Sequence, residues 1–307
     1  FDALLEELEI PRPRGDTAFT VDQAQRIAQG IGYPVLVRPS YVLGGRAMEI
    51  VHNSKDLREY MTSAVNVSPH HPVLIDKYLK GIELETDAIA DGRECLIPGI
   101  MEHIEKAGIH SGDSIAVYPP LHATPQLQQQ LVTYTTKLAR ALKIKGCLNI
   151  QYVYHENVLY VIEVNPRSSR TVPFLSKVTG VPIINLATKI SLGQTIASLG
   201  YKGGLLETQP FIGIKAPVFS FAKLYRLETS LGPEMKSTGE VLGINRHLPQ
   251  ALYKALLAAD LDLPLQGNVL ATIADKDKKE SFPLIQKFKE LGFNIFATQG
   301  TALFLEK

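Results

Sequence analysis

The side chains best suited to chemistry are two amides and a carboxylate, Gln151, Glu163 and Asn165, followed closely by Arg167 and Arg170. Amide and carboxylate oxygens are hard ligands of the kind that Mg²⁺ or Mn²⁺ prefers, especially where substrate phosphates complete the coordination. Arginines beside such ligands supply cations for oxyanions, as phosphoryl transfer requires. The alternatives are a half-buried sheet with a solvated polar face, followed by an ordinary solvated loop.

The strands that carry these residues are expected to form a hairpin. Residues 148–154 and 158–164 have strand composition, and we take 155–157 as a three-residue loop, which places Gln151 opposite Val161. Side chains alternate between the two faces of a sheet, so Gln151, Glu163 and Asn165 should share the polar face. The opposite, apolar face is expected to carry Leu148, Ile150, Tyr152, Tyr154, Val158, Tyr160, Ile162 and Val164.

A second candidate is the loop from Arg38 to Arg46, which contains the pair Gly44-Gly45. Two glycines let backbone N–H groups approach a phosphate closely. The alternative is a tight turn without any ligand, which is the commoner use of such a pair. The usual phosphate signatures are absent from the sequence, since it has no G-x-x-x-x-G-K-[ST] and Gly30-Ile-Gly32 lacks a third glycine.

Nucleophilic and zinc chemistry find less support. Residues 108–114 contain adjacent histidine and serine side chains, but no strand–turn–helix pattern surrounds them. His103 and His110 lie seven residues apart without a third ligand at helical spacing. Glu83 and Glu85 alternate with apolar residues, which predicts a strand with one solvated face.

Composition limits the class of protein. The 307 residues carry 32 Lys+Arg and 31 Asp+Glu, and this balance excludes the charge footprint of a general nucleic-acid binder. A hydrophobic fraction of 45% is typical of a folded protein, and the length suffices for two domains. Apolar runs stay well below the roughly 18 residues of a membrane helix. Two cysteines and the lack of signal-peptide features predict a cytoplasmic α/β protein that binds neither nucleic acid nor membrane.

The elements that must position the candidate residues follow from caps, turns and periodicity. Thr20 with Gln23 predicts a helix start, as does Thr124 before Pro125, and Asp91-Gly92 predicts a hairpin turn. Helices are expected over 1–8, 20–30, 53–65, 124–142, 172–179, 183–192, 247–259 and 281–291. Strands are expected over 34–38, 48–51, 72–76, 83–90, 95–100, 148–154, 158–164, 269–273 and 294–297, with loops and short strands over 200–213.

The final forty residues read as one βαβ unit. A unit of this size cannot bury both faces of a sheet, so we expect the chain to be a piece of a longer protein.

Four long segments resemble the ATP-grasp portion of the carbamoyl phosphate synthetase large subunit, in its bacterial form. They are VRPSYVLGGRAMEI at 37–50, MEHIEKAGIHSGDS at 101–114, IEVNPRSSRTVPF at 162–174 and GPEMKSTGEV at 232–241. The resemblance covers nearly the whole chain and is to the second, carboxy-terminal synthetase half. It implies an α/β (α+β) protein with an ATP-grasp nucleotide-binding and catalytic domain over 1–195. It also implies the last part of the synthetase unit, a small helical and loop segment with a linker, over 196–265. A truncated, methylglyoxal-synthase-like regulatory βαβ segment would occupy 266–307.

The resemblance implies ATP as cofactor and a role for each candidate residue. Arg38 and the loop with Gly44 and Gly45 would clasp the ATP phosphates. The adenine and ribose would be held by backbone groups of Lys77 and Leu79 and by Glu83, and the pocket would be completed by Gly108, Ile109, His110 and Ser111. Gln151 and Glu163 would contact the nucleotide's metal, with Asn165 as a third ligand of Mg²⁺ or Mn²⁺. Arg167 and Arg170 would act at the carbamate and the transferred phosphate, and the loop 103–114 would hold K⁺.

The implied reaction is phosphorylation of carbamate by a second ATP, which gives carbamoyl phosphate and ADP for pyrimidine and arginine biosynthesis. Carbamate is already an anion, so the site needs aligned cations rather than a general base. The implied partners are the amino-terminal synthetase half of the same chain, a glutamine amidotransferase small subunit, carbamate or bicarbonate as substrate, and a nucleotide effector near Lys278 and Thr298.

Two other functions stay open. One is a different ATP-grasp carboxylate–amine ligase or a biotin carboxylase, and the other is a non-catalytic nucleotide-binding and regulatory module that works only in a larger assembly. The resemblance implies that Phe1 follows the family's amino-terminal subdomain and that the regulatory domain is cut short. We therefore expect the chain alone to bind nucleotide poorly and to turn over slowly.

Overall fold

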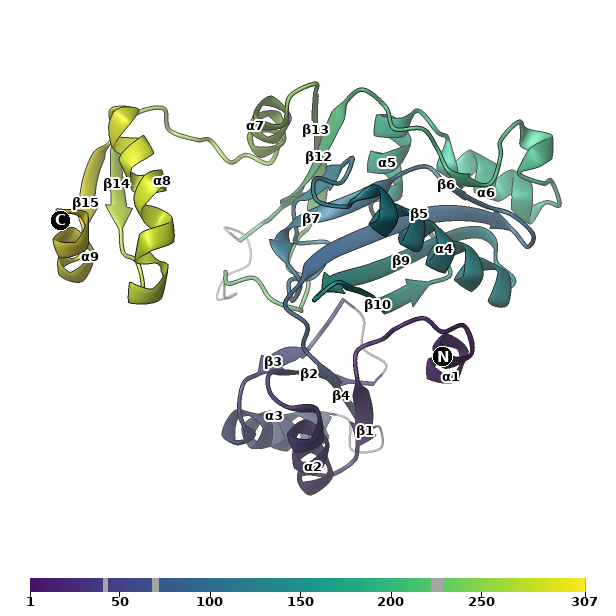
Figure 1. Cartoon of the computed structure of the whole chain (residues 1–307), viewed down its shortest axis with the longest axis horizontal. Helices are drawn as coiled ribbons and strands as arrows, with labels where there is room; N and C mark the ends of the chain where they lie inside the picture. Colours follow the sequence, from purple (N-terminus) through teal and green to yellow (C-terminus); the bar gives the residue numbers. More distant parts are fainter. Residues whose placement is uncertain (41–43, 68–71, 222–228, 307) are drawn as a thin grey trace. The chain divides into compact units, whose positions relative to one another are not determined.

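The computed structural model describes residues 1–40, 44–67, 72–221 and 229–306 (Figure 1). It divides into two compact units, Phe1–Asp260 and Leu261–Lys307. Within the described residues, no helix is both long and apolar enough to cross a membrane.

The first unit begins with a small four-stranded antiparallel sheet in the order β1-β4-β2-β3. Helices α2 and α3 pack on it over buried Ala24, Ala28 and Leu57. Thr20 accepts the Gln23 N–H at the start of α2, which confirms the predicted cap. The elements are α1 (Asp2–Glu7), β1 (Gly15–Ala18), α2 (Val21–Ile31), β2 (Val35–Pro39), β3 (Glu49–Val51), α3 (Ser54–Val67) and β4 (Val73–Lys77).

A larger sheet forms the centre of this unit, with strand order β10-β9-β5-β7-β8-β12-β13 and with β6 between β5 and β11. Its strands are β5 (Ile82–Asp91), β6 (Cys95–Ile97), β7 (Ile100–Lys106), β8 (Ala116–Tyr118), β9 (Lys145–His155), β10 (Val158–Asn165), β11 (Gly204–Leu205), β12 (Ile212–Val218) and β13 (Gly239–Asn245). The accompanying helices are α4 (Pro125–Ala141), α5 (Val172–Thr179), α6 (Ile183–Ser191), η1 (Ala197–Leu199) and α7 (Leu248–Ala258). Strands β1, β8 and β13, and most of β7 and β12, lie outside the predicted strands.

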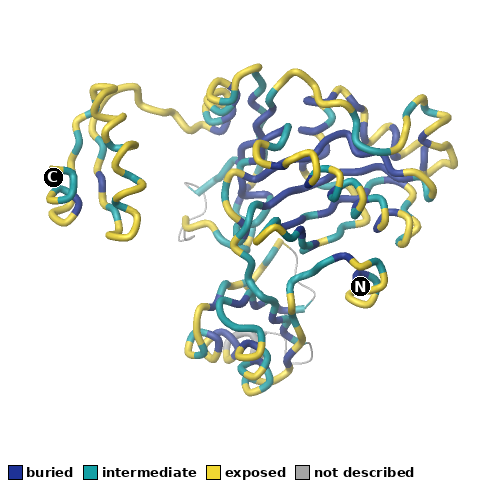
Figure 2. Tube along the Cα trace, viewed as in Figure 1, coloured by how far each residue is buried: buried dark blue, intermediate teal, exposed yellow. Residues whose placement is uncertain are grey.

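The two faces of the central sheet differ. Helix α4 packs against the apolar face, where Leu84, Ile150 and Tyr152 are fully buried. On the opposite face, α5 and α6 cover one end over Ile89 and Met101, and the other end carries polar side chains such as Glu85, Gln151 and Asn149. Figure 2 shows this sheet as the most buried part of the unit. The polar end is therefore supported from behind by a closely packed layer.

The hairpin β9–β10 has a shorter turn than we predicted. Glu156 and Asn157 form a two-residue turn with φ of +48° and +63°, and Val158 pairs with His155. The predicted three-residue loop is therefore wrong, and the first half of β10 faces the other way. Leu159 and Val161, rather than Val158, Tyr160 and Ile162, are the residues buried on the apolar face.

A β-bulge in β10 restores the predicted polar face. The register shifts between Val161, which pairs with Tyr152, and Glu163, which pairs with Gln151. In a regular strand Ile162 would pair with Gln151, and Glu163 would lie on the apolar face opposite Ile150. Gln151 is thus opposite Glu163 and not opposite Val161 as predicted, yet both share the polar face with Asn165.

The second unit contains the expected βαβ pattern. Strands β14 (Asn268–Ala271) and β15 (Asn294–Ala297) pair in parallel and are connected through η2 (Asp275–Asp277) and α8 (Lys278–Glu290), and α9 (Gln299–Leu305) follows. Large apolar side chains of this unit remain exposed, among them Leu270 at 71% and Phe296 at 57%. Forty-seven residues with such exposure have a small core.

A matched pair of glycines in β13 tests the packing of α7. A Cβ on Gly243 would overlap the Ala251 carbonyl oxygen, whereas a Cβ on Gly239 would stand 3.7 Å from the Val218 Cβ. We expect Gly243→Ala to lower the free energy of unfolding by about 2 kcal/mol, because overpacking a close contact costs that much. Gly239→Ala should change it by less than about 0.5 kcal/mol. Urea titrations followed by circular dichroism measure both, and equal effects would contradict the packing described.

Candidate active site

The polar end of the sheet is organised in cross-strand rows. In the first row, Gln151 on β9 lies opposite Glu85 on β5 and Glu163 on β10. Gln151 Nε2 donates to Ser111 Oγ at 2.9 Å. Within the part of the chain that the structure describes, Glu163 is exposed and pairs with no side chain. Its carboxylate is therefore available to a ligand.

The second row consists of Asp87 on β5, Asn149 on β9 and Asn165 on β10. Asn149 Nδ2 donates to Asp87 Oδ1 at 3.2 Å, and Asn165 Nδ2 donates to Asn149 Oδ1 at 3.3 Å. Asp87 Oδ2 also accepts the Thr171 and Ser169 hydroxyls at 2.6 and 2.8 Å. This row ties both ends of the arginine-bearing loop to the sheet.

The two predicted arginines lie on this loop, after β10. Arg167 donates to Asn165 Oδ1 at 3.2 Å, and Arg170 Nε lies 3.4 Å from Glu240 Oε1 on β13. Arg170 also donates to Ser237 Oγ at 3.2 Å. Both guanidinium groups are exposed and are held at the polar end by side chains of different strands.

Glu83 and Glu85 do not form the solvated face that we expected. They are 3% and 2% exposed, and the ring of buried His103 lies between them, 3.4 Å from Glu83 and 3.3 Å from Glu85. Burial alone would lower the pKa of His103, but the two carboxylates outweigh it and raise the pKa to about 9. Burial would raise the pKa of Glu85, yet His103, Lys215 and Asn149 together lower it. The three groups form a buried charged unit, and the predicted ribose ligand Glu83 is part of it.

Lys215 is a fully buried lysine that our sequence analysis missed. Its Nζ donates to the Ser111 carbonyl at 2.7 Å and lies 3.8 Å from Glu240 Oε1. Burying a charged side chain is unfavourable unless an opposite charge or hydrogen-bond acceptors lie close to it. The burial of Lys215 therefore indicates that acidic groups or acceptors surround this position. A single lysine in the apolar run 212–218 was the available signal.

A cavity of about 690 Å³ lies beside the polar end, within the range of sites for small ligands. Gly108 and Ile109, both predicted nucleotide contacts, line it together with Tyr78 and Glu49. The lining also contains Met48, Ile50, Lys106, Ala107, Ser230, Leu231, Gly232, Pro233, Glu234 and Lys236. The cavity therefore joins the small sheet, the 108–112 loop and the segment before β13.

The loop 108–112 connects this cavity to the rows of the sheet. Gly108 lies at the cavity, whereas a Cβ on Gly112 would stand 3.0 Å from the Arg170 guanidinium. His110 lies between them, with its Nδ1 accepting the Gly112 N–H at 3.0 Å. Burial lowers the pKa of His110, against the opposing effect of Asp113, Glu163 and Glu83. A ligand in the cavity could thus extend along this loop to Glu163 and the arginines.

Backbone conformation and packing inside the protein explain the two glycines of the 38–46 loop. Gly44 and Gly45 have φ of +63° and +66°, and a Cβ on Gly45 would overlap the Pro233 carbonyl oxygen. The Gly44 carbonyl accepts the Met235 N–H at 2.9 Å. The pair therefore packs against the segment before β13, and residues 41–43 of the predicted phosphate loop lie outside the described residues.

Arg38 and Lys77 are both held within the small sheet. Arg38 Nε lies 3.3 Å from Asp76 Oδ2. Burial raises the pKa of Asp76, an effect that Arg38 opposes. The Lys77 N–H donates to the Arg14 carbonyl at 2.7 Å and its Nζ donates to the Gly32 carbonyl at 2.9 Å. Leu79 follows β4, and its carbonyl accepts the Gly81 N–H at 3.1 Å.

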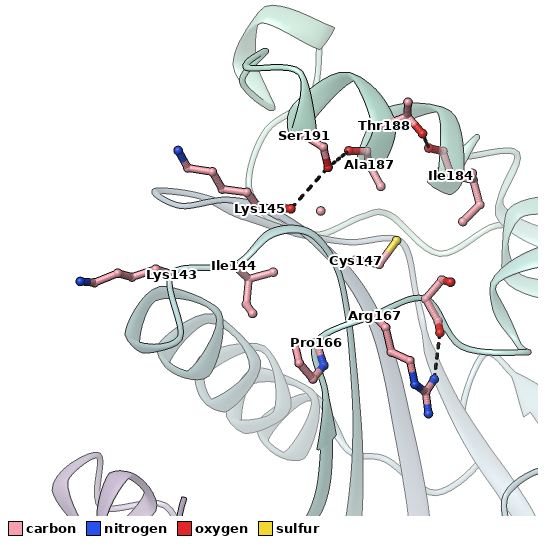
Figure 3. A pocket seen from close by; sticks show the side chains of 12 residues that line it. Lys143, Ile144, Lys145, Cys147, Pro166, Arg167, Ile184, Ala187, Thr188 and Ser191 are labelled. Carbon is pink, nitrogen blue, oxygen red and sulfur yellow. Dashed lines mark hydrogen bonds between the residues drawn. The ribbon is translucent and has the colours of Figure 1, made fainter. Parts of the chain in front are cut away.

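A second hollow, of about 390 Å³, lies on the other side of Arg167 (Figure 3). Cys147 and Pro166 line it from β9 and the end of β10, and Ser191 lines it from the end of α6. Arg167 donates to the Ser168 carbonyl at 2.9 Å at its rim. Burial raises the pKa of Cys147 to about 11, so the thiol is not an activated nucleophile.

The donor set at the polar end fits a divalent cation. Glu163 has a free carboxylate, Asn165 directs its oxygen toward Arg167, and Gln151 lies opposite Glu163. Among the described residues, no three His, Cys, Asp or Glu side chains are grouped to hold a metal, so the amides are essential to this set. A set with one carboxylate suits Mg²⁺ or Mn²⁺ whose coordination is completed by phosphates and water.

The charged unit around His103 predicts a pH dependence of stability. The folded chain binds the His103 proton more tightly than the unfolded chain, whose histidine titrates near 6.5. The resulting stabilisation is complete below pH 6.5 and is lost as the pH rises through about 9. We expect wild-type protein to lose about 3 kcal/mol over this window.

His103→Gln should lack this slope, and exposed His247→Gln should keep it. Urea midpoints measured between pH 6 and 9.5 check this, and a slope that persists in His103→Gln would contradict the assignment. Asp87 also loses stabilisation with the same sign near pH 7, because burial and then Glu85 raise its pKa to about 7. The slope above pH 8, where Asp87 is already ionised, is therefore the one that decides the test.

Several solved structures are similar to this chain. Biotin carboxylase from Campylobacter jejuni, in complex with β,γ-ATP, is 21% identical with a TM-score of 0.59, over 71% of this chain and 49% of that one. The biotin carboxylase domain of the Hydrogenobacter thermophilus 2-oxoglutarate carboxylase, with MgADP and bicarbonate, is 20% identical with a TM-score of 0.59, over 79% and 60%. An ADP complex of N5-carboxyaminoimidazole ribonucleotide synthetase is 16% identical with a TM-score of 0.64, over 85% and 69%.

These identities support the fold alone, and the chain spans about half of the first structure's length. The shared fold is the ATP-grasp fold, which confirms the predicted α/β class. A family model described as the carbamoyl-phosphate synthase L chain, ATP binding domain, matches residues 1–199. Those residues contain the small sheet, the two rows and both arginines. The chain therefore belongs to the carbamoyl-phosphate synthase large-chain ATP-binding domain family.

Proposed function

We propose that this chain transfers the γ-phosphoryl group of ATP to carbamate, giving carbamoyl phosphate and ADP. The observation that carries the proposal is the 108–112 loop. At one end it lines the cavity, and at the other it contacts Gln151 through Ser111 and approaches Arg170 through Gly112. The loop thus connects a nucleotide-sized cavity to the oxygen ligands and the arginines. In-line phosphoryl transfer requires the nucleotide, the metal ligands and the cations to lie next to one another in this way.

The residues at the polar end have the charges that this reaction needs. Carbamate and ATP are both anions, so the site must reduce their repulsion and align them. A divalent cation held by Glu163, Asn165 and Gln151 would neutralise charge on the phosphates. Arg167 and Arg170 would bind the carbamate and the phosphoryl group that is being transferred. No described group needs to remove a proton from carbamate.

The remaining assignments are part of the same proposal. Arg38, Gly44, Gly45, Lys77, Leu79 and Glu83 would contact ATP, with Gly108, Ile109, His110 and Ser111. The domain limits would be 1–195, 196–265 and 266–307, and K⁺ would lie near His103. In a longer cytoplasmic protein, this part would act with an amino-terminal synthetase half and a glutamine amidotransferase subunit, and an effector would bind near Lys278 and Thr298.

The reverse reaction tests the proposal, because carbamate is unstable. The chain, ADP, Mg²⁺ and carbamoyl phosphate should yield ATP, measured with a luciferase assay. ADP formation from ATP that responds to bicarbonate or to another acid, without ATP synthesis from carbamoyl phosphate, would favour a biotin carboxylase or another carboxylate–amine ligase. Nucleotide binding without either activity would favour a non-catalytic module.

Glu163 provides the first prediction. Glu163→Gln removes the charge of the proposed metal ligand but keeps its size, so we expect ATP synthesis to fall about 100-fold or more, the scale of a lost transition-state contact. Glu156→Gln, at the turn of the same hairpin and 84% exposed in its side chain, is the control and should keep full activity. Equal rates for wild type and Glu163→Gln would show that the polar face does not bind the metal.

Arg38 provides the second prediction. Arg38→Ala should weaken ADP binding about tenfold, because a charge-assisted contact to phosphate contributes on the order of 1–3 kcal/mol. Arg26 is an exposed arginine of α2, the helix that packs on the same small sheet, and serves as the control. The Arg26→Ala variant should bind ADP like the wild type. Isothermal titration calorimetry measures both, and unchanged affinity in Arg38→Ala would leave Arg38 as the partner of Asp76 only.

A further inference from the structure

The amide group of Asn149 has a fixed orientation. Its Nδ2 donates to Glu85 Oε1 at 2.6 Å and to Asp87 Oδ1 at 3.2 Å, so both of its hydrogens go to carboxylates. The residue is 1% exposed and its two acceptors are 2% exposed. Turning the amide over would direct its oxygen at two carboxylates in a buried setting, where such a contact is costly.

The carboxylates that set this orientation are themselves held in place. Glu85 Oε2 lies 3.3 Å from the His103 ring, and Thr171 donates to both Glu85 and Asp87. Asp87 additionally accepts the Ser169 hydroxyl. Asn149 thus shares Glu85 Oε1 with the Thr171 hydroxyl, 3.3 Å away, and among the described residues it is the one donor to Asp87 Oδ1.

The orientation of the Asn149 amide determines the orientation of the Asn165 amide. Because the Asn149 nitrogen faces β5, its oxygen faces β10 and accepts the Asn165 Nδ2 at 3.3 Å. Asn165 must then turn its own oxygen away from Asn149, where it accepts from Arg167 at 3.2 Å. Arginine only donates hydrogen bonds, which agrees with this orientation.

We propose that Asn149 is a positioning residue, which, held by Glu85 and Asp87, turns the Asn165 amide so that its oxygen faces the metal site. An asparagine can bind a cation only through its oxygen, so a reversed amide would direct an NH₂ group at the ion. The inference rests on the proposed metal-binding role of Asn165.

A double-mutant cycle separates orientation from packing. Asn149→Leu keeps the shape of the side chain but cannot orient Asn165. In the 307-residue chain with ADP, Mn²⁺ affinity measured by electron paramagnetic resonance should fall about tenfold or more, as for other residues that orient metal ligands. In an Asn165→Asp background either carboxylate oxygen can face the ion, so Asn149→Leu should change the affinity less than about twofold.

Equal losses in the two backgrounds would overturn the proposal, because they would show a general structural role. An unchanged Mn²⁺ affinity in Asn149→Leu alone would also overturn it. Circular dichroism and the urea midpoint confirm that each variant is folded.

A measurement on the wild-type chain needs neither metal nor variant. The Asn149 side-chain NH₂ signals, assigned through contacts to β5 and β9, should exchange with solvent far more slowly than those of Asn157 at the exposed turn. Exchange as fast as that of Asn157 would overturn the fixed orientation. If wild-type protein takes up no Mn²⁺ with ADP, the proposed function fails, and the exchange rates alone decide the orientation of Asn149.

Discussion

One extra residue in strand β10 determines which side chains meet at the polar end of the central sheet. The bulge at Ile162 reverses the alternation of the strand, so Leu159 and Val161 stay in the core under α4 while Glu163 and Asn165 face the opposite side. In a regular strand, burying Val161 would also bury the Glu163 carboxylate. The β-bulge therefore allows β10 to bury its apolar side chains in the core and still expose Glu163 and Asn165 at the site.

Behind the exposed ligands, buried polar groups satisfy one another in an ordered way. His103 and Lys215 supply positive charge to Glu85 and Glu240, and hydroxyls of the arginine loop bond to Asp87. Glu85 and Asp87 therefore have hydrogen-bond donors, and Glu83 and Glu240 lie within 4 Å of a basic side chain, as the low dielectric of the interior favours. The same network positions Asn165 and Arg170, so the groups that stabilise this end of the fold also orient its ligands.

Local signals in the sequence predicted much of the fold and part of the site. Thr20 and Thr124 cap their helices as expected, because capping depends on neighbouring residues. The shared face of Gln151, Glu163 and Asn165 was also predicted, but from a loop that is one residue too long and without the bulge, two errors that cancel at Glu163. Lys215 and the burial of Glu85 were missed, because the pairing of β12 with β8 and of β5 with β7 joins distant parts of the chain. Such pairing leaves no trace in local alternation.

The central claim is that a divalent cation binds to the exposed side chains of β9 and β10. Crystals grown with Mn²⁺ and ADP, measured at a wavelength where manganese scatters anomalously, test it directly. We predict an anomalous peak about 2.1 Å from a Glu163 carboxylate oxygen and from Asn165 Oδ1, with nucleotide phosphate on its other side. A peak bound elsewhere on the chain, with Glu163 and Asn165 free, would contradict the account.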